Sequence, residues 1–306
     1  MKPMTLIVST LIFVLFACSD SAPAPISNKT TASEIVASNN SVTTDQTDAI
    51  SPRYKNGTND QNKGDKTGIV RLHGNIAAAS GSMMYLYETE ARNIALLDSA
   101  KVVGGIFNFN NLEIGRGIYE LVLNGKANNK TQIILNPDES DVDIDFKSSR
   151  LTGNKTAPSS IENTAWFKYL TLENRNKNEI KNLRKGMKDS PYRSRIEEQI
   201  KGKELELVQT QHEMMDTYAG TYFAKLISWK NPMYPNSQGK YFEDLDPLDN
   251  SLIHNMAISD RIQGMMVKYS KGEDSGFFAC IDIIKAHFEP NPKTLESALY
   301  AMLDGF

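Results

Sequence analysis

Between residues 68 and about 147, apolar and polar residues alternate with a period of two over short runs separated by Gly, Asn, Asp and Ser. Alternation of this kind is typical of half-buried strands. The runs are residues 69–74, 83–87, 95–100, 106–109, 118–123, 131–135 and 142–146. Gly104 and Gly105 lie in a tight hairpin position, and Asn136-Pro137-Asp138 separates the last two runs. The pattern predicts a small antiparallel β-sandwich over residues 68–150.

Beyond Thr156 the apolar residues recur at helical spacing. A first helix carries the apolar positions Trp166, Tyr169, Leu170, Ile180, Leu183 and Met187. A second, long helix is predicted to begin with Ser190 as its N-cap and Pro191 in its first turn, and to run to about Trp229. Two helices joined by a short turn form a helical hairpin. Shorter helices are expected at 253–271, 277–288 and 293–303, so residues 157–306 form a helical region and the fold class is α+β.

The N-terminal pattern differs from both of these. One lysine, Lys2, is followed by an apolar run from Leu6 to Ala17, which is typical of a secretory signal peptide over residues 1–17. The run is shorter than the roughly 20 residues that a membrane-spanning helix needs. Leu15-Phe16-Ala17-Cys18 resembles a lipobox, in which the chain is cut before the cysteine and the thiol is acylated. An ordinary signal peptide with an incidental cysteine is the alternative.

Residues 18–67 are rich in Ser, Thr, Asn, Asp and Ala and poor in large apolar residues. Such a segment buries too little surface to offset its ordering entropy, so we expect a lipidated, disordered tether. Asp20-Ser21-Ala22 in this tether resembles an acceptor for periplasmic O-glycosylation at Ser21, whereas the similar Asp98-Ser99-Ala100 falls within a predicted strand. Ser19-Asp20-Ser21 lacks an acidic cluster, which favours a lipid-anchored protein of the outer membrane or cell envelope that faces the periplasm.

Composition limits the function classes. The chain has 306 residues and a formal net charge of -3, so nothing in it points to nucleic acid. Cys18 and Cys280 are its two cysteines, and once Cys18 carries lipid, no internal disulfide can form. Cys280 lies in an apolar helical run, and we expect its thiol to be buried and inert rather than reactive.

No metal or cofactor is predicted. The histidines are His73, His212, His254 and His287, and none has a partner at metal-ligand spacing; His212-Glu213 lacks the second histidine of a zinc-protease motif. The carboxylates Asp138, Glu139, Asp141, Asp143 and Asp145 suggest calcium at first sight. However, the last three alternate with Val142, Ile144 and Phe146, which is typical of the solvated face of a strand, and an EF-hand would need a glycine and a terminal glutamate that are absent.

The aromatic residues of the β region allow two interpretations. Tyr85, Tyr87, Phe107, Phe109 and Tyr119 could stack on sugars, which would make the region a glycan-binding module. At alternating strand positions, however, such residues more often build the core between two sheets. The pattern favours the core for all five.

Several segments also point to a family. They are residues 70–75, 84–87, 97–102, 105–109, 117–121 and 134–137. They resemble the N-terminal domain of unknown function (DUF4369-like) of Bacteroidetes-type TlpA-like thioredoxin lipoproteins, and the helical remainder, including residues 241–247, resembles the spacer that follows it. The resemblance implies that a thioredoxin domain with a CxxC pair would come next. This sequence has no CxxC, so no redox residue can be transferred to any position in it.

The function expected from these observations is that of a cell-envelope lipoprotein whose non-catalytic β-sandwich and helical region recognise or position an unknown envelope protein. It would have the lipid bilayer as a second partner through acylated Cys18. One alternative is a fragment of a TlpA-like thiol-disulfide oxidoreductase whose thioredoxin domain is missing. A second is a glycan-binding module.

Removing the anchor residue tests the lipoprotein prediction. We expect Cys18→Ala to move the protein from the membrane fraction to the soluble fraction, because stable anchoring needs more than one lipid chain and all of them depend on this residue. Sedimentation after a carbonate wash measures the change. A Cys18→Ala protein that still sediments with membranes would show that another anchor exists.

Overall fold

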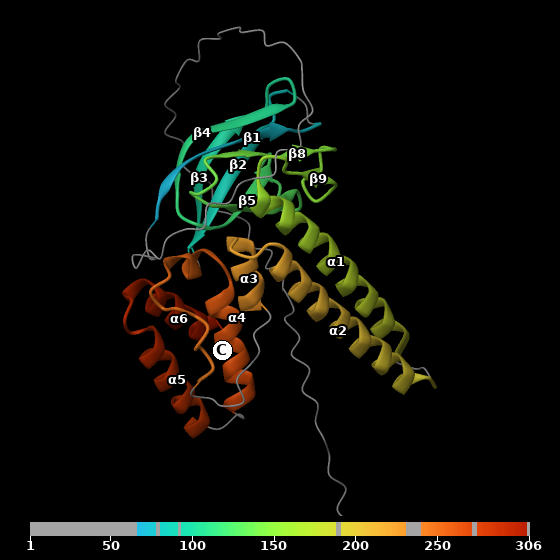
Figure 1. Cartoon of the computed structure of the whole chain (residues 1–306), viewed down its shortest axis with the longest axis vertical. Helices are drawn as coiled ribbons and strands as arrows, with labels where there is room; N and C mark the ends of the chain where they lie inside the picture. The colour runs from blue at the N-terminus through green and yellow to red at the C-terminus, as the bar shows by residue number, and fades with distance from the viewer. Residues whose placement is uncertain are drawn as a thin grey trace, which may run out of the picture. The chain divides into compact units, whose positions relative to one another are not determined.

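The computed structural model describes residues 66–77, 80–90, 93–187, 191–230, 240–270 and 274–304 (Figure 1). The segment predicted to be a signal peptide and nearly all of the predicted tether lie outside these residues. The strands are β1 (Gly68–Asn75), β2 (Met83–Glu90), β3 (Asn93–Lys101), β4 (Ile106–Ile114), β5 (Gly117–Leu123), β6 (Lys130–Leu135), β7 (Asp141–Asp143), β8 (Asp145–Phe146) and β9 (Lys155–Thr156). All of the predicted strands are present, and the last predicted run is divided between β7 and β8.

Two sheets account for the predicted sandwich. One has the order β4-β1-β7, and the other, fully antiparallel, has the order β3-β2-β5-β6. Along β4, Phe107 and Phe109 are buried while their neighbours are exposed, and in β2 Met84 and Leu86 are buried while their neighbours are half-buried. These side chains belong to one hydrophobic core, so the alternation in the sequence reports which face of each strand lies inside.

Strand β7 runs parallel to β1, which is an exception within an otherwise antiparallel arrangement. The approach of the chain beyond β7 is close: a Cβ atom on Gly74 of β1 would lie 1.8 Å from the carbonyl oxygen of Ile144. Only glycine fits at position 74.

Gly104 and Gly105 form the predicted tight turn, with φ of +60° and +83°. Positive φ at both central residues is typical of the two-residue turns that join twisted strands, and glycine adopts it without strain. The strands that the turn joins belong to different sheets, so this turn connects the two layers.

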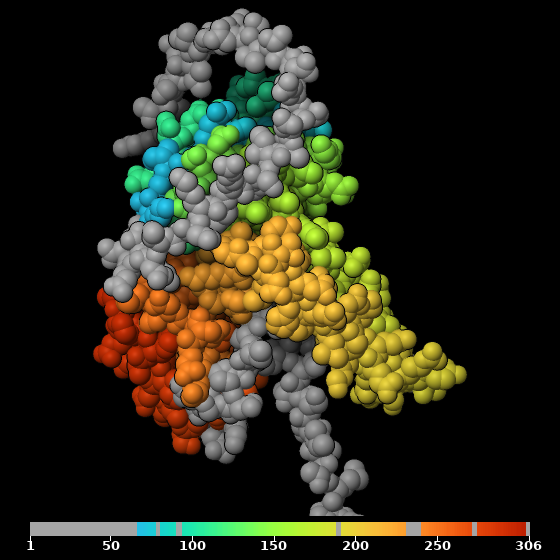
Figure 2. All heavy atoms as spheres, in the orientation of Figure 1, coloured from blue at the N-terminus to red at the C-terminus, as the bar shows by residue number. Residues whose placement is uncertain are grey.

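The helices are α1 (Ile161–Met187), α2 (Arg193–Thr217), α3 (Tyr222–Lys230), the 3-10 helix η2 (Asn250–His254), α4 (Ala257–Tyr269), α5 (Asp274–Phe288) and α6 (Pro292–Asp304). Helices α1 and α2 form the predicted hairpin, whose far end stands clear of α4, α5 and α6 in Figure 2. Within it, Asn176 is buried and donates a hydrogen bond to the carbonyl of Lys203 (2.8 Å). No helix in the described residues has a stretch long and apolar enough to cross a bilayer.

The prediction of one long second helix was wrong. Helix α2 ends at Thr217, Gly220 adopts φ of +83°, and α3 begins at Tyr222. The Thr221 hydroxyl accepts a hydrogen bond from the N–H of Ala224, as an N-cap residue does. A residue with positive φ cannot continue a right-handed helix, so α2 and α3 are separate.

The predicted start of the second helix was also wrong. The helix begins at Arg193 with Tyr192 at the N-cap position, and Tyr192 forms no capping hydrogen bond through its side chain. Pro191 lies in the turn before the helix, and Ser190 lies outside the described residues.

A buried polar cluster connects the sheets to the helices. We call Asn136, Glu139, Glu162 and Asn163 the joint. Glu139, in the turn after β6, accepts hydrogen bonds from the N–H groups of Ile161 (2.8 Å) and Glu162 (3.2 Å), so a residue of the β region caps α1. The described residues belong to one compact unit, and the joint lies between its two parts.

Glu162 repeats this arrangement one step further along the chain. Its fully buried carboxylate accepts hydrogen bonds from the N–H groups of Tyr222 (2.8 Å) and Phe223 (2.7 Å) at the start of α3, and from the side chain of Asn136 (3.0 Å). Burial raises the pKa of Glu162, and the hydrogen bonds from Phe223 and Tyr222 act in the opposite direction. One carboxylate therefore holds β6, α1 and α3 together.

We expect Glu162→Gln to lower the free energy of unfolding by about 2–3 kcal/mol, because the amide has one acceptor where the carboxylate has two and leaves a buried N–H unpaired. Urea denaturation of the full mature chain measures the change. Glu198→Gln, at an exposed position on α2, is the matched control and should stay within about 0.5 kcal/mol of wild type. Equal effects of the two substitutions would contradict the structural role of Glu162.

Candidate functional site

The predicted modification sites are only partly covered by the structure. Cys18, the lipidation site, and Ser21, the O-glycosylation candidate, lie outside the described residues. Ser99, the second candidate acceptor, lies in β3 as expected. The prediction that Cys280 is buried is confirmed, since its side chain has no exposed surface and lies in the core beside α5 residues such as Ile284.

No cluster of His, Cys, Asp or Glu that could hold a metal ion occurs in the described residues. His73 on β1 lies beside two carboxylates of β7, 3.2 Å from Asp141 and 3.5 Å from Asp143. As predicted, Val142, Ile144 and Phe146 are buried while Asp141, Asp143 and Asp145 face outward to varying degrees.

The other two acidic residues of that run have separate partners. Asp138 pairs with Lys66 and with Arg116, whose guanidinium nitrogen lies 2.7 Å away. Burial raises the pKa of Asp138, but the contacts with Lys66 and Arg116 outweigh it and hold this pKa below its ordinary value. Glu139 belongs to the joint. The acidic run thus consists of residues that contact different parts of the fold, with Asp141 and Asp143 sharing His73.

The interpretation of the aromatic residues as core is confirmed for Phe107, Phe109 and Tyr119 and wrong for Tyr85 and Tyr87. Because Met84 and Leu86 of β2 point into the core, the residues between and after them must point to the outer face of the sheet. The two tyrosine rings lie half-buried there with centroids 6.5 Å apart. They are the residues on which the glycan-binding alternative would depend.

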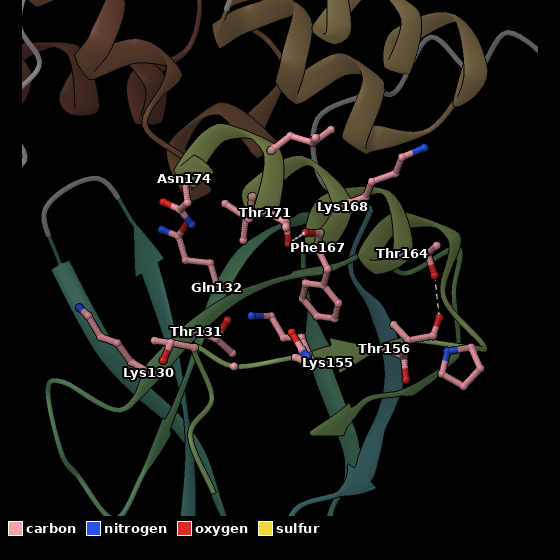
Figure 3. A pocket seen from close by; sticks show the side chains of 17 residues that line it. Lys130, Thr131, Gln132, Lys155, Thr156, Thr164, Phe167, Lys168, Thr171 and Asn174 are labelled. Atoms are coloured by element: carbon pink, nitrogen blue, oxygen red, sulfur yellow. Dashed lines mark hydrogen bonds between the residues drawn. The ribbon is translucent and has the colours of Figure 1, made fainter. Parts of the chain in front are cut away.

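A cleft of about 870 Å³ lies between β6, the segment that contains β9, and α1 (Figure 3). Its size is within the range of ligand-binding clefts. Its lining residues are Lys130, Thr131, Gln132, Thr152, Gly153, Asn154, Lys155, Thr156, Ala157, Pro158, Thr164, Phe167, Lys168, Leu170, Thr171, Leu172 and Asn174. Three lysines and no carboxylate line the cleft, although the whole chain is slightly acidic.

Lys155 lies at the centre of this cleft. Its ammonium group lies 5.0 Å from the ring centre of Phe167 and donates a hydrogen bond to the carbonyl of Leu151 (3.2 Å). Figure 3 shows Lys155 and Phe167 pointing toward each other, whereas the side chains of Lys130 and Lys168 extend outward from the two sides of the cleft. Burial lowers the pKa of Lys155, so an anion in the cleft would relieve the cost of its desolvation.

The wall opposite α1 is held by side-chain hydrogen bonds. Asn129, just before β6, accepts a hydrogen bond from the N–H of Leu151 (2.8 Å) and donates one to the carbonyl of Ser149 (2.9 Å). On the other side, Thr164 of α1 donates to the carbonyl of Ala157 (2.8 Å). The cleft is therefore formed before any ligand binds.

Sequence reasoning missed this cleft. Its residues come from three separate segments, and each taken alone is ordinary: an edge strand, a polar loop and the flank of a helix. The available signal was the run Thr152-Gly153-Asn154-Lys155-Thr156 between the predicted sandwich and the first helix, which has no carboxylate and several hydrogen-bonding side chains.

A scan against models of known protein families and a search of the curated proteins both find no match for this chain. The resemblance to TlpA-like lipoproteins described above therefore stays a prediction.

The buried position of Cys280 can be tested through its reactivity. We expect the native protein to react with a thiol reagent at least about 100-fold more slowly than the protein in urea, because the thiol is reached only when the helical core opens. The same protein should not reduce insulin in the presence of dithiothreitol, since a reductase cycle needs a second, resolving thiol. The absorbance of Ellman's reagent and the turbidity of insulin are the measurements. Rapid native labelling, or insulin turnover lost on Cys280→Ser, would support the oxidoreductase alternative.

Proposed function

We propose that the protein is a cell-envelope lipoprotein, anchored through Cys18, whose β-sandwich and helical region form a non-catalytic module that recognises or positions an envelope partner. The observation that carries this proposal is the cleft between β6, the β9 segment and α1. It combines a preformed shape with a single sign of charge, which suits recognition.

The distribution of ionisable groups supports binding rather than catalysis. Burial raises the pKa of Glu139 and of Glu162, and raised carboxyl pKa values often mark catalytic acids. Both carboxylates, however, cap helices inside the joint, and neither lines the cleft. The lining residues of the cleft include lysine, threonine, asparagine and glutamine, which bind ligands well, and do not include a carboxylate or imidazole, two of the side chains that commonly act as a general base.

The joint supports the positioning part of the proposal. Asn163 belongs to the joint, and its side chain also holds β6 at the cleft: it accepts a hydrogen bond from the N–H of Ile134 (2.9 Å) and donates one to the carbonyl of the same residue (2.7 Å). The sheet edge and α1, which form two walls of the cleft, are thus fixed to each other. A ligand bound there would keep a constant orientation relative to the helical hairpin.

Photo-cross-linking in cells tests this function. We expect a photoreactive amino acid in place of Asn174, which lines the cleft from an exposed position on α1, to give a discrete adduct. The same amino acid in place of Glu198, exposed on α2 and away from the cleft, is the matched control and should give none. Electrophoretic mobility of the purified lipoprotein is the measurement. The absence of an adduct at Asn174, or identical adducts at both positions, would contradict recognition through this cleft.

A further inference from the structure

One edge of strand β6 is open along the cleft. In the order β3-β2-β5-β6, this strand has β5 on one side and, among the strands that the structure describes, none on the other. In an antiparallel pair, the N–H and C=O of successive residues point alternately toward the partner strand and away from it. The backbone N–H and C=O of Ile134 point away from β5, because both groups form hydrogen bonds with the Asn163 side chain.

The same alternation applies to Gln132, two residues earlier. Its N–H and C=O point to the same side as those of Ile134, and neither group has a hydrogen-bond partner among the described residues. Gln132 also lines the cleft. Edge groups of this kind pair with an added strand, which is how several peptide-binding domains capture their ligands.

At Ile134, the next residue of β6 with outward backbone groups, the Asn163 side chain takes the place of a neighbouring strand. Its amide supplies one acceptor and one donor to Ile134, as a residue of a neighbouring strand would. An added strand would therefore end at Asn163 and extend from Gln132 toward Lys130, along the cleft.

The positive charge of the cleft favours an added strand with acidic side chains. Lys130 is paired with Glu120 (3.0 Å), whereas no carboxylate lies among the lining residues around Lys155 and Lys168. A chain lying between β6 and α1 would pass Lys155 at the centre of the cleft (Figure 3). An acidic side chain would form a charge-assisted hydrogen bond there, and a basic one would be repelled.

We propose that the cleft binds an extended acidic segment of a partner protein, which adds as a strand to β6 at Gln132 and places a carboxylate on Lys155. This inference rests on the proposed function, for which it names the chemistry of the partner. Main-chain hydrogen bonds to β6 supply affinity that is independent of sequence, and Lys155 supplies the preference for acidic residues.

Selection from a random dodecapeptide display library against the full mature chain tests the proposal. We expect the enriched peptides to be rich in Asp and Glu. Binding should weaken about tenfold or more in Lys155→Met, which removes the charge and keeps the apolar stem, whereas Lys201→Met, at an exposed position on α2, should bind as wild type.

A second pair of variants isolates the main-chain contact. Gln132→Pro removes the outward N–H and should bind at least about tenfold more weakly than Gln132→Ala, which loses the same side chain but keeps that N–H. Proline is tolerated on an edge strand where the N–H faces away from the sheet, so the variant should fold. Amide hydrogen exchange at Gln132 in the wild-type protein should slow when the peptide is added.

Several outcomes would overturn the inference. Peptides without acidic enrichment, equal binding by Gln132→Pro and Gln132→Ala, or unchanged exchange at Gln132 would each exclude strand addition. Binding on a glycan array that is lost in Lys155→Met, with no peptide selected, would assign the cleft to sugars. Any of these results together with a cross-linked adduct at Asn174 would leave the proposed function standing, whereas the loss of that adduct would remove both.

Discussion

The fold depends on a buried carboxylate that accepts hydrogen bonds from neutral N–H groups and from no cation in the part of the chain that the structure describes. Glu162 is withdrawn from water, which is costly for a charged group unless hydrogen bonds replace its hydration. Three N–H donors do so, and they come from Asn136 beside the sheet and from Tyr222 and Phe223 some 60 residues further along the chain. An apolar contact would tolerate sliding, but a carboxylate with fixed donors does not. In this chain the charge defines how the sheets and helices fit together.

The sequence was sufficient for the regular parts of the fold and insufficient where a local irregularity changed the pattern. In β4, Phe107 and Phe109 alternate correctly, but the next buried residues, Leu112 and Ile114, are out of phase with them. A bulge at Asn111, with φ of +55°, inserts one extra residue opposite β1 and shifts the alternation. The strand therefore continues to Ile114, beyond the run that a strict period of two identifies.

The break between α2 and α3 was predictable in principle, because Gly220 followed by Thr221 combines a helix terminator with an N-cap residue. The joint was not predictable, because Glu162 reads as an ordinary acidic residue in a first helical turn. Its role depends on α3 being brought close by tertiary packing. The cleft was hidden for the same reason: the proximity of Lys155, Gln132 and Phe167 is a property of three segments that meet only in the folded chain.

The open edge of β6 also bears on how copies of this protein behave when they meet one another. An exposed strand edge is a site at which identical chains can associate and begin to aggregate. Here, two copies meeting edge to edge would bring Lys155 and Lys168 of each toward the same lysines of the other, and like charges in a confined space repel. The lysines would thus favour the binding of an acidic strand and disfavour the pairing of β6 with β6 of a second copy.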